Sequence, residues 1–219
     1  MRFEDVLRRL EHVPERLPDG PASLIPVVAE TGAPRPRPPW DEAATSSRPA
    51  AVLILLYPDD AGDARVVLTE RADHGGHHSG EVSFPGGKAE PSDADLVSTA
   101  LREASEEVGL DTGLAGIRVL GSLPVRWIPV SNFAVTPIIA AMDRRPVLVP
   151  QPSEVAAILE PRVAAFLPGA EMITVEREIR GWQVSYAAYP VDGLAVWGMT
   201  AMVLGSLGAH LAVEVPADA

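Results

Sequence analysis

The sequence contains no cysteine, which excludes disulfide bonds, thiol nucleophiles and zinc–thiolate sites. It also contains no apolar run of the roughly 18 residues that a membrane-spanning helix needs, so we expect no membrane partner. Cations are few, with 18 Lys and Arg against 30 Asp and Glu, and the net charge is −12. A protein that binds nucleic acid through a broad basic face needs an excess of cations, so we expect no nucleic-acid partner.

The acidic balance sets a condition on any phosphate chemistry. An acidic protein that handles phosphate groups needs local compensation from metal ions, from a few Arg or Lys, or from helix N-termini. The hydrophobic content of 47% is sufficient for a buried core. Residues 1–17 carry a charge every few positions and lack the apolar centre of a signal peptide. We therefore expect a globular protein that is not secreted, with a cytoplasmic location.

The composition divides the chain near residue 49. Residues 2–12 place Phe3, Val6, Leu7 and Leu10 at helical spacing, which predicts a short amphipathic helix. The stretch 13–49 is rich in proline, which excludes a regular helix or a central strand. We interpret residues 1–49 as a helix and Pro-rich extension that packs along the domain or joins a partner. Residues 50–215 form the compact domain.

Strand-like runs dominate the compact domain. The run AAVLILLY at 50–57 is continuously apolar, as in a strand buried on both faces, and the turn DDAGD joins it to ARVVLTER at 64–71 as a hairpin. A short strand is expected around Val82 to Phe84. Further strands are expected in RVLGSLPVRW, NFAVTPIIAAM, and the paired runs MITVEREI and WQVSYAAYPV. With few βαβ repeats, this order predicts an α/β (α+β) fold with a mixed sheet between helices.

Three further segments have helical character. PSEVAAILEPRVAAFL at 152–167 has helical periodicity but contains Pro161, and VWGMTAMVLGSLGAHL at 196–211 predicts an amphipathic helix that closes the domain. The third helix is expected from about Ala94 to Val108, with Ser92 and Asp93 as capping side chains and Gly109 as its end. A stripe of apolar residues on this helix is expected to face the core: Val97, Leu101, Ala104 and Val108.

Three glutamates, Glu103, Glu106 and Glu107, crowd the last two turns of that helix, on the side opposite the apolar stripe. Carboxylates oppose the helix dipole there, and Glu103 and Glu107 repel each other at i, i+4. Only Glu106 has a cation three or four residues away, namely Arg102. A divalent cation such as Mg²⁺ would compensate this charge. The alternative is a solvated acidic face.

The stretch GGKAEPSDADLVSTALREASEEVGL, at 86–110, resembles the Nudix box. It has one residue more than the usual spacing before Arg102, and Asp93 stands at the first acidic position. This insertion, together with LTERADHGGHHSGEVSFPGGK upstream, resembles the coenzyme A pyrophosphatase branch of the Nudix hydrolase family. The resemblance covers about residues 50–212. Two positions depart from the branch, which usually has arginine at position 76 and glutamine at position 81, here Gly76 and Glu81.

The resemblance implies an α/β/α sandwich with a mixed central sheet and a loop–helix–loop box. It implies Mg²⁺ or Mn²⁺ as cofactor, held by Glu103, Glu107, Glu106 and the carbonyl oxygen of Gly86. Arg102 belongs to the catalytic set as the residue that pairs with Asp93 or Glu90 and holds the loop. A carboxylate must take a proton from the attacking water, and both Glu106 and Glu154 are candidates.

Several residues are candidates for contacts with the substrate. Arg71 and Lys88 would bind its phosphates, and His78 lies in the loop where the branch has its signature, with His74 and His77 beside it. Trp127 and Phe133 either stack an adenine or pack in the core.

The leading functional hypothesis is a Nudix diphosphatase that splits coenzyme A or acyl-coenzyme A into 4′-phosphopantetheine and adenosine 3′,5′-bisphosphate. Because Gly76 replaces an arginine, the same chemistry on NADH, ADP-ribose or a nucleoside triphosphate stays open. A non-catalytic Nudix-like regulator that binds nucleotides is the alternative from another class. The expected partner is a small-molecule nucleotide, and a homodimer is a candidate assembly.

Overall fold

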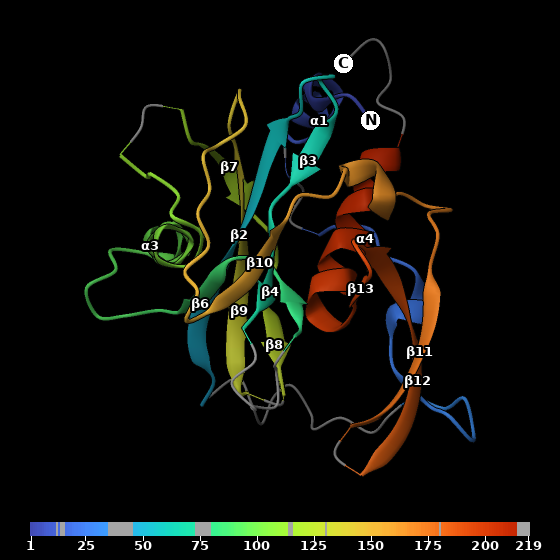
Figure 1. Cartoon of the computed structure of the whole chain (residues 1–219). Helices are drawn as coiled ribbons and strands as arrows, with labels where there is room; N and C mark the ends of the chain where they lie inside the picture. The colour runs from blue at the N-terminus through green and yellow to red at the C-terminus, as the bar shows by residue number, and fades with distance from the viewer. Residues whose placement is uncertain are drawn as a thin grey trace.

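The structure is a computed structural model that describes residues 1–11, 13, 16–34, 46–72, 80–113, 116–129, 131–179 and 181–213. Its centre is a six-stranded sheet with the order β3-β2-β9-β7, in which β6 also pairs with β2 and β8 with β9 (Figure 1). Only β2 and β9 run parallel among these pairs. The strands are β2 (Arg48–Pro58), β3 (Ala64–Val66), β6 (Gly86–Lys88), β7 (Arg118–Ser122), β8 (Arg126–Ile128) and β9 (Phe133–Ala141). The predicted mixed sheet is confirmed.

Strand β2 separates two hydrophobic clusters. Alternate side chains point to opposite faces of a strand. Ala50, Val52, Ile54 and Leu56 pack in a cluster with α1 (Phe3–Arg9) and α4 (Gly198–Ala212), whereas Ala51, Leu53, Leu55 and Tyr57 pack in a cluster with α3 (Leu96–Val108). Figure 1 shows α3 and α4 on opposite sides of the central strands. Burial on both faces explains the continuous apolar run, and the layers form the expected α/β/α sandwich.

Two smaller antiparallel sheets complete the fold. One has the order β10-β4-β5, and the other has β1-β12-β11 with β13 paired to β12. The strands are β1 (Val27–Val28), β4 (Leu68–Arg71), β5 (Val82–Ser83), β10 (Val155–Leu159), β11 (Ile173–Ile179), β12 (Trp182–Val191) and β13 (Leu194–Val196). The predicted hairpin of 50–57 with 64–71 is present as β2 and β3, and the pair of MITVEREI with WQVSYAAYPV is present as β11 and β12.

Residues 152–167 were expected to be helical, and this prediction is wrong. They form β10 and a short 3₁₀ helix, η2 (Val163–Phe166). β10 pairs with β4, so its backbone groups form hydrogen bonds with the neighbouring strand. The residues at its two ends, Val155 and Leu159, are buried. The same pairing divides the predicted strand 64–71 between two sheets, as β3 and β4. The predicted strand 118–127 is likewise split into β7 and β8, with Pro124 between them.

Helix α4 is buried on most of its surface, contrary to the amphipathic pattern expected from its sequence. An added Cβ at Gly208 would lie 2.0 Å from the carbonyl oxygen of Phe166, and one at Gly205 would lie 3.0 Å from side-chain atoms of Leu24, Pro21 and Tyr189. The two glycines therefore let α4 approach η2 and the N-terminal segment closely. Apolar residues on nearly all sides of the helix are buried for this reason.

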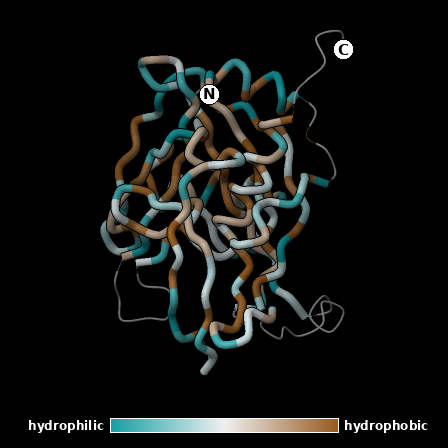
Figure 2. The backbone as a smooth tube through the Cα atoms, turned by 90° about the vertical axis from the view of Figure 1, so that its right-hand side faces the viewer, coloured by the Kyte–Doolittle hydropathy of each residue, from teal (hydrophilic) through white to brown (hydrophobic). Residues whose placement is uncertain are grey.

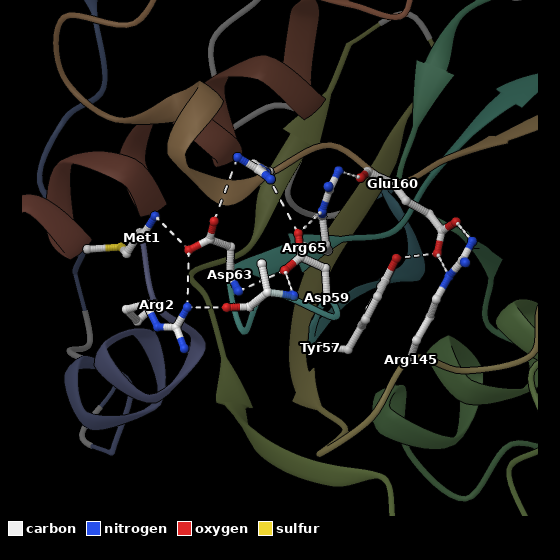
Figure 3. A network of polar contacts seen from close by, with 10 residues as sticks. Met1, Arg2, Tyr57, Asp59, Asp63, Arg65, Arg145 and Glu160 are labelled. Atoms are coloured by element: carbon white, nitrogen blue, oxygen red, sulfur yellow. Dashed lines mark hydrogen bonds and ion pairs between the residues drawn. The ribbon is translucent and has the colours of Figure 1, made fainter.

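The N-terminal segment packs against the domain. Phe3, Val6, Leu10, Leu17 and Leu24 are buried in the same cluster as α4. The backbone is joined as well, because Phe3 N donates to Gly62 O (3.0 Å) and Ala64 N donates to Met1 O (3.0 Å). Figure 3 shows the polar contacts of Met1 and Arg2 with the turn that carries Asp59 and Asp63. The helix α1 is shorter than the predicted 2–12.

The distribution of hydropathy matches this arrangement. In Figure 2 the hydrophilic stretches of the tube lie mainly at its periphery. Among the described residues, no helix has both the length and the apolar character needed to cross a membrane.

We propose that the N-terminal segment and the domain unfold as one unit. Leu10 is 0% exposed, and Leu10→Ala should lower the free energy of unfolding by about 3 kcal/mol, because a buried leucine leaves a cavity when truncated. Val147 is 85% exposed, and Val147→Ala should change stability by less than about 0.5 kcal/mol. Denaturant unfolding followed by circular dichroism and tryptophan fluorescence measures both variants. Two separate transitions, with only the minor one shifted by Leu10→Ala, would contradict the proposal.

Candidate active site

The site is built on α3 and the loop before it. The helix begins with Asp95 as N-cap, whose Oδ1 accepts a hydrogen bond from Ser98 N (2.7 Å). The prediction that Ser92 and Asp93 cap the helix is therefore wrong. Asp93 instead accepts hydrogen bonds from Glu90 N (2.9 Å) and Thr99 Oγ1 (2.9 Å), which closes the loop onto the first turn. The helix ends as predicted at Gly109, whose φ of 64° is left-handed.

Arg102 is the centre of the polar contacts on α3. Its Nε and Nη2 donate to the two carboxylate oxygens of Asp93 (2.9 and 3.1 Å), which is one of the two pairings expected from the sequence. Nη2 also donates to the carbonyl oxygen of Lys88 and to Glu103 Oε1, both at 3.0 Å, and Nη1 donates to Glu106 Oε2 at 3.0 Å. These bonds hold the pKa of Asp93 below its usual range and raise that of Arg102. One guanidinium thus joins loop and helix.

Glu107 does not lie on an open face of the helix, contrary to the prediction. Glu107 is 5% exposed, and its Oε2 accepts a hydrogen bond from Gly86 N at 3.1 Å. The predicted stripe does face the core, since Ala104 and Val108 are buried and Val97 and Leu101 pack against the same cluster, but the buried side also includes Thr99 and Ala100. The reason is that α3 packs against β6 as well as against β2. A carboxylate on that side is enclosed between helix and strand.

Two glycines make this close packing possible. A Cβ at Gly87 would lie 2.5 Å from the carboxylate of Glu103, and one at Gly86 would lie 2.4 Å from the carbonyl oxygen of Ala51. Gly86 also has a φ of 154°, which side-chain-bearing residues rarely adopt. The sequence analysis assigned a role to Gly86 but missed Gly87. Its signal was the second glycine of FPGGK, which leaves room for a carboxylate on the facing helix.

The loop that carries Glu154 is attached to the C-terminal end of α3. Val149 N donates to Val108 O (2.9 Å) and Gln151 N donates to Glu107 O (2.8 Å), so two of the last helical carbonyl groups are satisfied. Ala72 N then donates to Glu154 O (2.9 Å), next to Arg71 at the end of β4. These bonds bring Glu154 and Arg71 to the glutamates of α3.

The carboxylates influence one another. Burial raises the pKa of Glu107 to about 7, the Gly86 N–H bond and the charge of Arg71 lower it, and the charges of Glu103 and Glu154 raise it. Burial also raises the pKa of Glu103, against the neighbouring Arg102, and the charges of Glu106 and Glu154 add to the rise. From the sequence, Glu103 has no cation three or four residues away on the helix. In the structure, the adjacent Arg102 forms an ion pair with it. Glu103, Glu107 and Glu154 therefore form one electrostatic cluster.

The remaining candidates lie in different places. Glu106 is 55% exposed and turned to Arg102, and Lys88 is exposed at the end of β6. Trp127 is half-buried, with its Nε1 donating to Asn132 Oδ1 at 3.0 Å, and the ring of Phe133 is covered by the guanidinium of Arg48 at 4.2 Å from its centroid. Three predicted positions, His74, His77 and His78, lie outside the described residues, as does Gly76.

The donor set suits a hard divalent cation. Within the described ranges, no three Asp, Glu or His side chains already converge on one point at metal-binding distance. However, Glu107 is a buried carboxylate that accepts a hydrogen bond from Gly86 N, and the charges of two further carboxylates raise its pKa. A buried anion in this state is stabilised by a cation, and carboxylate oxygens are the ligands that Mg²⁺ and Mn²⁺ prefer. Glu103 and Glu107 therefore fit the implied ion.

A loop–helix unit of this kind, attached to a mixed sheet, defines the class of the protein. The sequence profile of the NUDIX domain matches residues 47–166, and the chain belongs to the Nudix family. Nudix hydrolase 15, mitochondrial, of Arabidopsis thaliana is 39% identical over 161 residues, which are 71% of this chain and 55% of that protein. Nudix hydrolase 22, chloroplastic, of the same plant is 38% identical over 161 residues, 71% of this chain and 52% of that protein.

A bacterial relative is matched over most of its own length. The uncharacterized Nudix hydrolase NudL of Yersinia pestis is 35% identical over 175 residues, 78% of this chain and 82% of that protein. The chain spans about half the length of the two plant relatives that it matches.

Removal of the Glu107 charge should stabilise the metal-free protein in a pH-dependent way. The folded-state pKa is about 7 and the ordinary value is 4.5, so between these pH values the folded state binds more protons than the unfolded state. The free energy of unfolding then falls as pH rises through this window. Glu107→Gln avoids that loss, so its advantage over the wild type should grow by up to about 3 kcal/mol between pH 4.5 and 7.5.

Urea unfolding in a chelator measures this advantage. Glu178→Gln is the control, because Glu178 is an exposed glutamate on β11. Its stability relative to the wild type should stay flat across the same pH range. A flat difference for Glu107→Gln as well would show that Glu107 is not held as a buried carboxylate.

Proposed function

We propose that the protein is a divalent-cation-dependent hydrolase that cleaves the diphosphate link of a nucleotide. The observation that carries this proposal is the buried carboxylate of Glu107, which is bonded to Gly86 N and lies close enough to Glu103 and Glu154 for their charges to raise its pKa. A structural carboxylate gains nothing from such neighbours. A carboxylate that binds a cation gains from them, because each adds to the negative field that holds the ion.

In this proposal Glu103, Glu107 and the carbonyl oxygen of Gly86 hold Mg²⁺ or Mn²⁺. When bound, the ion supplies charge stabilisation for the diphosphate oxygens and lowers the pKa of the attacking water. Arg102 acts through its contacts, because it positions Glu103 and the loop that carries Gly86. Arg71 contributes positive charge beside Glu107, where the phosphate oxygens of the substrate would lie.

The general base is assigned to Glu154 rather than to Glu106. Glu106 is bonded to Arg102 and 55% exposed, so its carboxylate is turned outward. The charge of Glu154 acts on both Glu103 and Glu107, and its loop is attached to the end of α3. A proton acceptor has to lie beside the attacking water, and Glu154 satisfies this condition better.

The proposed substrate is coenzyme A or an acyl-coenzyme A, cleaved to 4′-phosphopantetheine and adenosine 3′,5′-bisphosphate. The support is the signature-like stretch LTERADHGGHHSGEVSFPGGK and the one-residue insertion before Arg102. Gly76 and Glu81 depart from that signature, so NADH, ADP-ribose and nucleoside triphosphates belong in the same substrate panel. Release of phosphate-containing products with and without Mg²⁺ tests this choice directly. No turnover of any of these compounds would overturn the proposal and favour a non-catalytic regulator.

Mg²⁺ or Mn²⁺ should raise the melting temperature of the wild type. An ion that binds only the folded state stabilises it by about 2.7 kcal/mol at one hundred times its Kd. For a protein of this size, this corresponds to roughly 5 °C or more. The shift should vanish in Glu103→Gln/Glu107→Gln and persist in Glu178→Gln. An equal shift in the double variant would place the ion elsewhere.

Turnover should separate the three glutamates by role. Glu107→Gln should lower kcat at least a hundredfold, about 3 kcal/mol in barrier terms, because an amide is a poor ligand for the ion. Glu154→Gln should lower kcat by a similar factor but keep the melting-temperature shift with Mg²⁺. Glu106→Gln should have the smallest effect. Steady-state kinetics with coenzyme A measures all three, and a larger loss in Glu106→Gln than in Glu154→Gln would reverse the assignment of the base.

A further inference from the structure

Four neighbouring strands place two cations in one row across the central sheet. Near the start of β2, Ala50 pairs with Lys88 of β6 on one side and with Val135 of β9 on the other, and Val135 pairs with Arg126 of β8. Directly paired residues project from the same face of a sheet. Ala50 and Val135 pack in the cluster that contains α4, not in the cluster that contains α3. Lys88 and Arg126 therefore project from the face turned away from α3.

Arg48 adds a third cation to this face. It lies two residues before Ala50 on β2, so it has the same orientation, and it pairs with Phe133 of β9. Its guanidinium is held 4.2 Å from the centroid of the Phe133 ring, and its Nη2 donates to Ser131 O at 2.9 Å. With strands about 4.8 Å apart, the three cations fall within about 15 Å of one another. We call Lys88, Arg126 and Arg48 the basic row.

The basic row has no internal counter-charge. In the part of the chain that the structure describes, no carboxylate lies within 4.0 Å of Lys88, Arg126 or Arg48. Most of the other described arginines do have such a partner, as expected for a protein with a net charge of −12. Lys88 and Arg48 are exposed and Arg126 is half-buried. Cations left together without carboxylates in an acidic protein favour an anionic ligand.

The basic row begins at the strand that also carries the carboxylate cluster. Gly86 N bonds to Glu107, and the carbonyl oxygen of Lys88, two residues later, bonds to Arg102. The carboxylate cluster and the basic row therefore lie on opposite faces of the short strand β6, and a nucleotide that contacts both has to pass around that strand. Lys88 is closest to the cluster along β6, while Arg126 and Arg48 lie on strands further across the sheet.

We infer that the basic row binds a phosphate monoester that the nucleotide carries on its ribose, in addition to the diphosphate that is cleaved. The inference rests on the proposed function and names a class of substrate for it. Coenzyme A carries such a group at the ribose 3′ position and NADPH carries one at the 2′ position, whereas NADH and ADP-ribose carry none. Arg126 and Arg48 are then specificity-determining residues, because they contact a group remote from the bond that breaks.

Binding of nucleotides without metal tests the inference independently of catalysis. The probes are adenosine 3′,5′-bisphosphate, adenosine 2′,5′-bisphosphate and 5′-AMP, titrated calorimetrically in a chelator. The wild type should bind one bisphosphate at least tenfold more tightly than AMP, and the preferred isomer tells which ribose position is read. Arg126→Gln should remove that preference, and Arg126→Lys should keep part of it, while AMP binding changes less than twofold.

Arg118→Gln is the matched control. Arg118 also lies on a strand paired with β9, but opposite Ala141 at the other end, and it has Asp143 as partner at 3.3 Å. It should bind all three nucleotides as the wild type does. A melting curve identifies any variant that fails to fold, in which case Arg48→Gln provides the same comparison. Equal affinity of the wild type for AMP and both bisphosphates would overturn the inference.

Turnover then separates the inference from the proposed function. With coenzyme A and its 3′-dephospho form as substrates, Arg126→Gln should raise KM for coenzyme A about tenfold, with kcat and the dephospho-substrate little changed. Hydrolysis of both substrates at equal efficiency by wild type and variant would refute the inference and leave the hydrolase intact. Absence of hydrolysis of either and of every other compound in the substrate panel, with the preference for a bisphosphate retained, would refute the proposed function and support the basic row.

Discussion

The ion pair between Arg102 and Asp93 is the interaction on which the site depends. Loop residues 86–95 have only short stretches of regular structure, and the guanidinium connects them to α3 through Asp93 and the carbonyl oxygen of Lys88. The same side chain neutralises Glu103 and turns Glu106 outward. Without it, Glu103 would be half-buried with no counter-charge, and the loop would lose its main polar contact with the helix.

The enclosure of Glu107 follows from that attachment. Once the loop is held, β6 lies against α3. Gly87 leaves space for the carboxylate of Glu103, and Gly86 lets β6 approach the backbone of β2. Burial raises the pKa of Glu107 to about 7, so the folded protein bears an unfavourable buried charge, which the proposed cation would relieve. In the proposed function, the stability that this charge costs the metal-free protein would be linked to the affinity for the ion.

The central sheet distributes two kinds of chemistry to its two sides. Carboxylates gather at the edge of β6 beneath α3, and cations stand on the face that is turned toward α4. In the proposed function, this separation would let an acidic protein present negative charge to a metal ion and positive charge to a phosphate group without mutual cancellation. The parallel pairing of β2 with β9 places Arg48 beside Phe133. Because β8 also pairs with β9, Arg126 lies on the same face.

The sequence by itself determined the mixed sheet, the presence of α3 and its end at Gly109, because these depend on local periodicity, on glycine and on spacing, whereas its N-cap, Asp95, was not predicted. Only the tertiary structure decided which of the acidic residues on α3 are buried. Glu107 is buried because α3 packs against β6 as well as against β2, so its buried side extends beyond the predicted apolar stripe. Residues 152–167 became β10 and η2, since pairing with β4 outweighs helical periodicity. The basic row could not be predicted from the sequence either. Lys88, Arg126 and Arg48 are separated along the chain and meet only through strand register, which is set by pairing between distant segments.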